Sequence, residues 1–159
     1  MSNRVVVTGL GTLNPLGQSL KESWANMLAG KSGNARIHDV EEFIDFPTTI
    51  AGEVKVFDPE KHGINAKDAR RTARFIQLAI AASREAVIDS GLDIEPIADD
   101  VGVIIGSGVG GIEILETQAR TLVEKGIRRV SPFTVPMMIT NMAAGLVAIE
   151  LKAKGPNLC

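Results

Sequence analysis

Two short runs of β-branched residues, each leading through a glycine-rich turn into a helical pattern, most constrain the fold of this chain. Residues 4–8 (RVVVT) lead into glycines at 9 and 11, and residues 101–105 (VGVII) lead into glycines at 106, 108, 110 and 111. Uninterrupted apolar strands are typical of sheets that are covered on both faces. The sequence therefore predicts an α/β fold with two buried strands, of which the first is central.

The composition limits how the core is built and what the chain binds. Hydrophobic residues make up 45% of the 159 residues, but aromatic residues only 4%, so aliphatic side chains must fill the core. This length suffices for one domain over residues 1–159 that buries roughly 70% of the surface of its unfolded chain. The net charge of −2 gives no general attraction to nucleic acid or anionic membranes.

The same composition indicates a reduced, cytoplasmic setting. Neither a signal peptide nor an apolar run long enough to span a membrane is evident in the sequence. The single cysteine, Cys159, excludes an intrachain disulfide and a cysteine-based zinc site. We therefore expect no metal and no other cofactor.

Helical spacing predicts four helices, over residues 17–29, 67–90, 112–125 and 137–154. The alanines of the second indicate close packing on a neighbour. The fourth is almost wholly apolar and is expected to be buried on most sides. A strand is expected within residues 50–57, Pro132 and Pro136 frame a loop, and the chain turns toward a new strand near Cys159. We also expect Phe43, Phe46 and Phe57 to hold residues 31–60 against the body.

The glycines at 106, 108 and 111 satisfy the G-x-G-x-x-G pattern between a strand and a helix. Such a turn can let a pyrophosphate approach the backbone at a helix N-terminus, so a dinucleotide site is one interpretation. About 20 residues further on, where that site needs an acid for the ribose, the chain is instead basic at residues 125–130. The alternative, a turn that permits close backbone packing, is favoured.

Cys159 is a second candidate for chemistry. A nucleophilic cysteine needs a helix N-terminus, a cation or a histidine that stabilises its thiolate. His38 and His62 lie in polar, turn-rich sequence, where a surface histidine is typical. We therefore do not expect Cys159 to be a nucleophile.

A third candidate is a basic cluster at the start of the second predicted helix. Its members follow i, i+3, i+4, i+7 spacing and would form one stripe on a continuous helix: Lys67, Arg70, Arg71 and Arg74. Such a stripe is often simply a solvated helix face. The functional alternative is a docking surface for an acidic partner, which chiefly increases the association rate.

Five motifs, in order and in register, resemble the N-terminal half of a β-ketoacyl-acyl-carrier-protein synthase of the elongating type. They are residues 5–11 (VVVTGLG), 106–111 (GSGVGG), 131–136 (SPFTVP), 141–145 (NMAAG) and 155–157 (GPN). The resemblance runs from about residue 4 to the last residue. It implies a thiolase-like α/β fold, the N-terminal half of a five-layered α-β-α-β-α body that dimerises.

The resemblance also implies where the reaction centre lies. The family's nucleophilic cysteine would follow shortly beyond Cys159, and its two catalytic histidines and supporting lysine lie further on. This chain is therefore expected to carry no catalytic residue, to be inactive alone and to associate with itself. The implied partners of the whole protein are acyl carrier protein, fatty acyl and malonyl thioesters, and a second subunit.

Matched positions imply roles for residues within this chain. Val109 matches the residue that gates the acyl pocket, and the other implied pocket or dimer-contact residues are Phe133, Thr134, Val135 and Met138. Ordinary core packing is their alternative. The basic residues Lys67, Arg70 and Arg71 match positions that meet the acidic carrier protein.

Two departures from the family pattern accompany these matches. Thr72-Ala73 replace a Met-Asp pair, and Thr134 stands where a bulkier aromatic residue can occur. A non-catalytic module that binds carrier protein or pairs with another synthase half is the alternative function.

Overall fold

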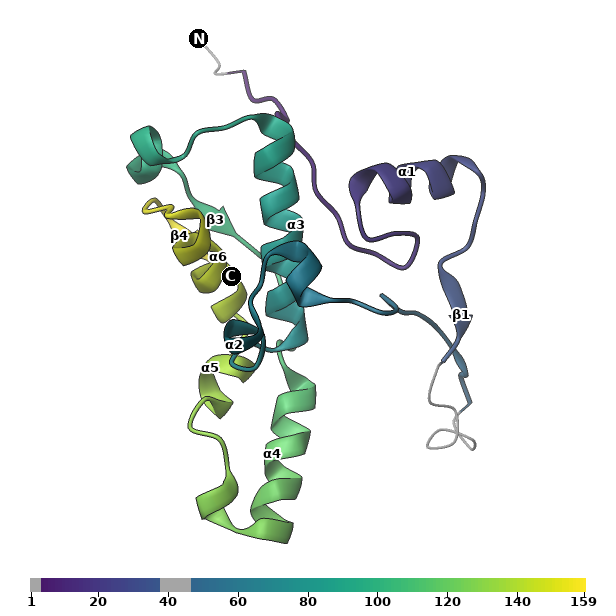
Figure 1. The fold of residues 1–159 in the computed structure, drawn as a ribbon, viewed down its shortest axis with the longest axis vertical. Helices are drawn as coiled ribbons and strands as arrows, with labels where there is room; N and C mark the ends of the chain where they lie inside the picture. The colour runs from purple at the N-terminus through teal and green to yellow at the C-terminus, as the bar shows by residue number, and fades with distance from the viewer. Residues whose placement is uncertain (1–3, 38–46) are drawn as a thin grey trace.

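The structure is a computed structural model that describes residues 4–37 and 47–159, and two packed helices form its centre (Figure 1). These are α3 (Arg74–Ser90) and α6 (Met142–Leu151). Ile76 of α3 is fully buried, and Val147 of α6 lies in the same hydrophobic cluster together with Ala143 and Ala144. Small alanines on α6 let the two helices approach closely, so the core is aliphatic as the composition requires.

The described part of the chain contains two small sheets, of which the first packs on α6. The strands β3 (Val103–Ile104) and β4 (Asn157–Leu158) are parallel, and the Val103 N–H donates to the Pro156 carbonyl at 2.8 Å. The strands β1 (Asn34–Arg36) and β2 (Ile50–Gly52) form an antiparallel pair. The predicted strands within residues 50–57 and near the C-terminus are therefore confirmed, although each is short. A strand also forms within residues 101–105, but it is only partly buried, contrary to the prediction, because Ile104 is 73% exposed.

The prediction of a buried, central strand at residues 4–8 is wrong. This segment has no strand partner in either described sheet, and Val5 is 92% exposed. Only the residues that follow run along α3, where the Leu10 N–H donates to the Asp89 carboxylate at 2.9 Å and the Thr12 N–H to Glu85 at 2.8 Å (Figure 1). A strand needs neighbouring strands that share its hydrogen bonds, and valine content alone does not supply them.

The alanines of α3 do pack closely on a neighbour, as predicted. A Cβ atom built on Gly9 would lie 2.3 Å from the Ala86 carbonyl oxygen, and one built on Gly11 would lie 2.1 Å from that of Ala82. The N-terminal segment therefore lies directly on the backbone of α3.

The predicted helix over residues 67–90 is two helices. A short α2 (Ala66–Ala69) is capped by the Asn65 side chain, and α3 begins only at Arg74. The buried Gln77 side chain holds the break, because its amide donates to the carbonyls of Ala69 and Thr72 at 2.9 Å each. Ala73 is the N-cap of α3 and makes no side-chain capping bond there.

The predicted helix over residues 137–154 is also interrupted. A short α5 (Thr134–Met138) precedes α6, so the expected loop between Pro132 and Pro136 is partly helical. Proline fits there because the first turn of a helix does not use its N–H groups. As predicted, most of α6 is buried or half-buried, and only Ile149 and Glu150 are exposed on it.

The other helices lie around this centre. They are α1 (Leu20–Leu28), α4 (Ile112–Lys125) and the 3-10 helices η2 (Pro59–His62), η3 (Glu95–Asp100) and η4 (Ile127–Arg129). The α1 and α4 predictions are confirmed. Phe57 packs partly buried against the core, whereas Phe43, Phe46 and His38 lie outside the described residues. No helix in the described ranges has the length and apolar content needed to cross a membrane.

Candidate functional site

The basic cluster does not form the single helical stripe that its spacing predicts. Lys67 lies in α2, Arg70 and Arg71 lie in the turn after it, and Arg74 opens α3; all four are exposed. Arg74 turns toward the protein, where its guanidinium donates to the Val54 carbonyl and lies 5.6 Å from the Phe57 ring. Arg74 is therefore engaged in holding the segment before η2.

Arg71 also lies over an aromatic ring. Its guanidinium carbon is 5.2 Å from the centre of the Phe133 ring, a distance typical of a cation–π contact. Phe133 is the residue immediately before α5. One residue predicted for docking therefore contacts one residue predicted for the acyl pocket.

Arg71 and Phe133 line a cavity of about 400 Å³ between the α2–α3 turn, α5 and α6. Its wall is mainly apolar, and its charged groups are Asp68, Arg71 and Glu150. The apolar wall comprises Ile80, Phe133, Pro136, Met142, Leu146 and Ile149. Such a cavity suits a flexible apolar group whose polar end stays at the charged rim.

The other predicted pocket residues are not part of the lining of this cavity. Val109 is 61% exposed in the glycine turn, and Val135 is exposed on α5. Thr134 and Met138 are half-buried, and the Thr134 hydroxyl donates to the Ser131 carbonyl at 2.6 Å. The described residues thus do not bring all five into one enclosed pocket.

The glycine turn packs directly on α5. A Cβ atom on Gly110, whose φ is +74°, would lie 2.3 Å from the Met138 carbonyl oxygen, and one on Gly111 would lie 2.4 Å from that of Met137. The Gly111 N–H donates to the same Met138 carbonyl at 3.0 Å. The interpretation of this turn as a close backbone contact is therefore confirmed.

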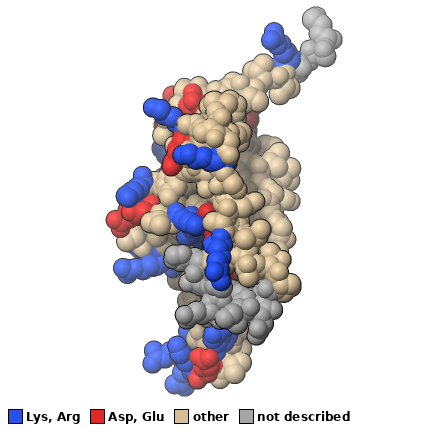
Figure 2. Space-filling model, turned by 90° about the vertical axis from the view of Figure 1, so that its right-hand side faces the viewer, with Lys and Arg blue, Asp and Glu red and all other residues tan. Residues whose placement is uncertain are grey.

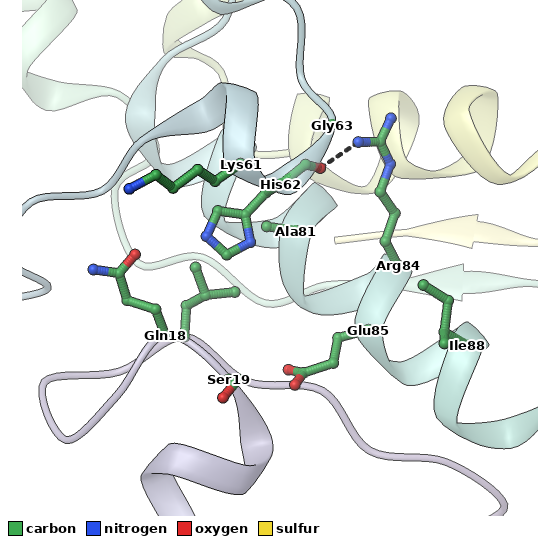
Figure 3. A pocket seen from close by; sticks show the side chains of 10 residues that line it. Gln18, Ser19, Lys61, His62, Gly63, Ala81, Arg84, Glu85 and Ile88 are labelled. Carbon is green, nitrogen blue, oxygen red and sulfur yellow. Dashed lines mark hydrogen bonds between the residues drawn. The ribbon is translucent and has the colours of Figure 1, made fainter.

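A second cavity, of about 550 Å³, lies between the N-terminal segment, η2 and α3 (Figure 3). Lys61, His62, Arg84 and Glu85 line it. The Glu85 carboxylate is already used, since it accepts the N–H groups of Thr12 and Leu20 at 2.8 and 2.7 Å. The sequence analysis missed this cavity because its residues come from three separate segments.

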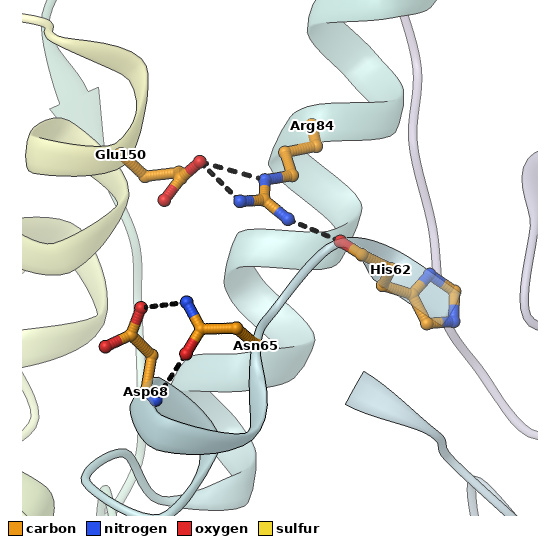
Figure 4. Close-up of polar contacts among 5 residues, drawn as sticks. All are labelled: His62, Asn65, Asp68, Arg84 and Glu150. Atoms are coloured by element: carbon orange, nitrogen blue, oxygen red, sulfur yellow. Dashed lines mark hydrogen bonds and ion pairs between the residues drawn. The ribbon is translucent and has the colours of Figure 1, made fainter. Parts of the chain in front are cut away.

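Arg84 also links α3 to α6 (Figure 4). Its guanidinium forms an ion pair with Glu150, with an Nε to Oε1 distance of 3.1 Å, and donates to the His62 carbonyl. The His62 ring stacks on Phe57 with ring centres 5.1 Å apart, which agrees with the predicted turn histidine. Within residues 4–37 and 47–159, no cluster of His, Cys, Asp or Glu is placed to hold a metal ion.

Comparison with known proteins decides the family. The sequence profile described as "Beta-ketoacyl synthase, N-terminal domain" matches residues 2–159. The chain belongs to the β-ketoacyl synthase family. This confirms the resemblance found in the five motifs and displaces the dinucleotide-binding alternative for the glycine turn.

Individual β-ketoacyl synthases extend the match. The chain is 50% identical over 157 residues to 3-oxoacyl-[acyl-carrier-protein] synthase 2 of Staphylococcus aureus (strain COL), and 45% identical to that of Synechocystis sp.. Each match covers 98% of this chain and 37% of the relative, so the chain spans little more than a third of the relatives' length.

A solved structure of the family matches the fold. The crystal structure of a beta-ketoacyl synthase from Burkholderia phymatum superposes with a TM-score of 0.78 at 26% identity, over 99% of this chain and 38% of the other. The predicted fold class, the N-terminal half of a thiolase-like α/β body, is confirmed.

Proposed function

We propose that this chain is the N-terminal part of a β-ketoacyl-acyl-carrier-protein synthase, which condenses an acyl thioester with malonyl-carrier protein in fatty acid elongation. The observation that carries the proposal is the 50% identity over 157 residues to a protein named 3-oxoacyl-[acyl-carrier-protein] synthase 2. The apolar cavity beside exposed cations supports it, because the substrate combines an acyl chain with an acidic protein.

The proposed reaction has two steps, both centred on residues that this chain does not contain. A cysteine thiolate attacks the acyl thioester, and the carrier thiol leaves. Malonyl thioester then loses carbon dioxide, the resulting enolate attacks the acyl carbonyl, and the cysteine thiolate leaves with a β-ketoacyl thioester formed. In this proposal Phe133, Thr134, Val135 and Met138 contribute to the acyl-pocket wall, and Val109 stands at its gate.

Activity of the complete gene product tests this assignment. We expect the full-length protein, supplied with an acyl-carrier protein and malonyl-carrier protein, to release carbon dioxide and form a product two carbons longer. The isolated 159-residue chain is the matched control and should form none. Carrier-protein binding by the full-length protein without condensation would favour the non-catalytic module instead.

The proposed docking surface consists of Lys67, Arg70 and Arg71. All three are exposed, and no ion pair of their side chains occurs within the described parts of the chain. Exposed cations without an ion-pair partner attract an acidic partner over roughly one Debye length, about 8 Å at physiological ionic strength. Arg74 contributes less, because its guanidinium is engaged with Val54 and Phe57.

Charge reversal tests the docking surface. We expect the double variant Arg70→Glu and Arg71→Glu of the full-length protein to associate with carrier protein at least about tenfold more slowly at low salt. The matched control reverses Lys21 and Lys31, which changes the net charge equally at and just after α1. Stopped-flow kinetics over a range of salt concentrations measure both, and equal rates for the two double variants would contradict the assignment.

Assembly and location complete the proposal. We propose that the full-length protein forms a homodimer in the cytoplasm. The broad apolar surface of this chain supports a subunit interface. Sedimentation of the full-length protein tests the dimer, and cell fractionation tests the location.

A further inference from the structure

Of the four basic residues in the cluster, only Arg71 lines the cavity between the α2–α3 turn, α5 and α6. Its contact there is the Phe133 ring, 5.2 Å from the guanidinium carbon. Both side chains are exposed to solvent. A partner that approaches from outside can therefore reach Arg71 without first opening the cavity.

Phe133 is fixed to the short helix α5. The Met137 N–H donates to the Phe133 carbonyl at 2.9 Å, and the Phe133 N–H donates to the Ser131 hydroxyl at 3.2 Å. These bonds tie Phe133 both to the loop before it and to the last turn of α5. A displacement of the Phe133 backbone therefore displaces the Met138 end as well.

The other end of α5 touches the glycine turn with no space between them. The Met138 carbonyl accepts the Gly111 N–H at 3.0 Å, and the backbone of Gly110 is too close to this oxygen to leave room even for a Cβ atom. Val109 precedes Gly110 directly. One continuous path of contacts thus joins Arg71, Phe133, α5 and the turn that carries Val109.

We propose that Arg71 is a positioning residue that couples docking of an acidic partner to the position of α5 and of the Val109 turn. The inference rests on the proposed function, because it takes the carrier protein as that partner. A partner carboxylate that binds the Arg71 guanidinium makes a charge-assisted hydrogen bond, which is stronger than an exposed cation–π contact. Docking therefore draws Arg71 from the ring and releases the N-terminal end of α5.

The coupling has a definite sign and size. Because the Phe133 ring competes with the partner for Arg71, removing the ring should tighten partner binding. An exposed cation–π contact corresponds to a factor of about two to five in an equilibrium constant. By reciprocity, docking weakens the ring contact by the same factor.

A double-mutant cycle on the full-length protein tests the coupling. The change Phe133→Leu is combined with Arg71→Gln or with Arg70→Gln, and affinity for unacylated carrier protein is measured by calorimetry. Arg70 is the matched control, since it carries the same charge one residue away and contacts no ring in the described structure. We expect Phe133→Leu to tighten binding about two- to fivefold in the wild type and in the Arg70→Gln background, and to have no effect with Arg71→Gln.

Methyl resonances of Val109 report the far end of the path. Saturating carrier protein should shift these resonances in the wild type and in Arg70→Gln, but not in Arg71→Gln. Equal shifts in the Arg70→Gln and Arg71→Gln variants would overturn the coupling. So would an effect of Phe133→Leu on affinity that is the same in both backgrounds, and neither result would contradict docking itself. If carrier protein binds none of the proteins, docking and coupling are both overturned, and the condensation assay still decides the proposed function separately.

Discussion

The glycines of the turn at residues 106–111 differ in how much space surrounds them. Gly110 and Gly111 lie against the backbone of α5, whereas Cβ atoms on Gly106 and Gly108 would meet no atom within 4 Å. The sequence pattern treats all of them as equivalent, because spacing carries no information about what faces each residue. The favoured packing interpretation could be predicted, but which glycines make the contact could not.

Two alanine substitutions compare a crowded glycine with an open one. We expect Gly111→Ala to destabilise the full-length protein by about 1–3 kcal/mol, because its Cβ atom would overlap a backbone oxygen that cannot move alone. Gly108→Ala, with open space and no left-handed backbone, should change stability by less than about 0.5 kcal/mol. Urea unfolding measures both, and equal effects would contradict the packing of this turn.

The basic residues show a second limit at this scale. Their spacing correctly marked a basic surface, yet it assumed a continuous helix over residues 67–90. The Gln77 amide, which holds the break between α2 and α3, makes its bonds only once the chain has folded. The contact of Arg71 with Phe133 joins positions 62 residues apart, so no local pattern could indicate it.

At the scale of elements, helices were predicted better than strands. Apolar periodicity located α1, α3, α4 and α6, because amphipathic spacing is a property of a segment itself. Strand formation at residues 4–8 depends on neighbours, and the valine run could not say which neighbours it would have. The short α5 was missed because Pro132 before it and Pro136 within it suggested a loop.

The packing of α3 against α6 makes its own prediction. We expect Ile76→Ala to lower the free energy of unfolding by about 2–5 kcal/mol, since Ile76 is completely buried between the helices. The control is Ile88→Ala on the same helix, where the side chain is 80% exposed and the cost should stay below about 0.5 kcal/mol. Denaturant titration of the full-length variants tests this, and similar losses for both would show that α3 is not packed as described.

At the scale of the whole molecule, the chain exposes more surface than its size requires. Its accessible surface is 11309 Å², against about 7,700 Å² for a typical folded monomer of 16.9 kDa. Large uncharged areas lie beside the charged groups (Figure 2), and exposed apolar residues occur on α1, α4 and the N-terminal segment. The difference of about 3,600 Å² is more than the roughly 1,000–2,500 Å² that one partner of an obligate interface buries.

The isolated 159-residue chain should therefore associate with itself. Exposed apolar patches of more than a few hundred Å² are rare in monomers, so we expect oligomers at micromolar concentration. Sedimentation velocity over a range of concentrations measures this, with the full-length protein as the comparison. A single monomeric species at every concentration would refute the prediction.

The exposed valines at residues 5–7 have one more consequence. Their backbone N–H groups have no strand partner in the described structure, so solvent deuterium should replace these hydrogens almost at once. Whatever later covers this segment must slow that replacement. The deuterium uptake of a short N-terminal peptide, followed over time, would then report when these first residues become covered.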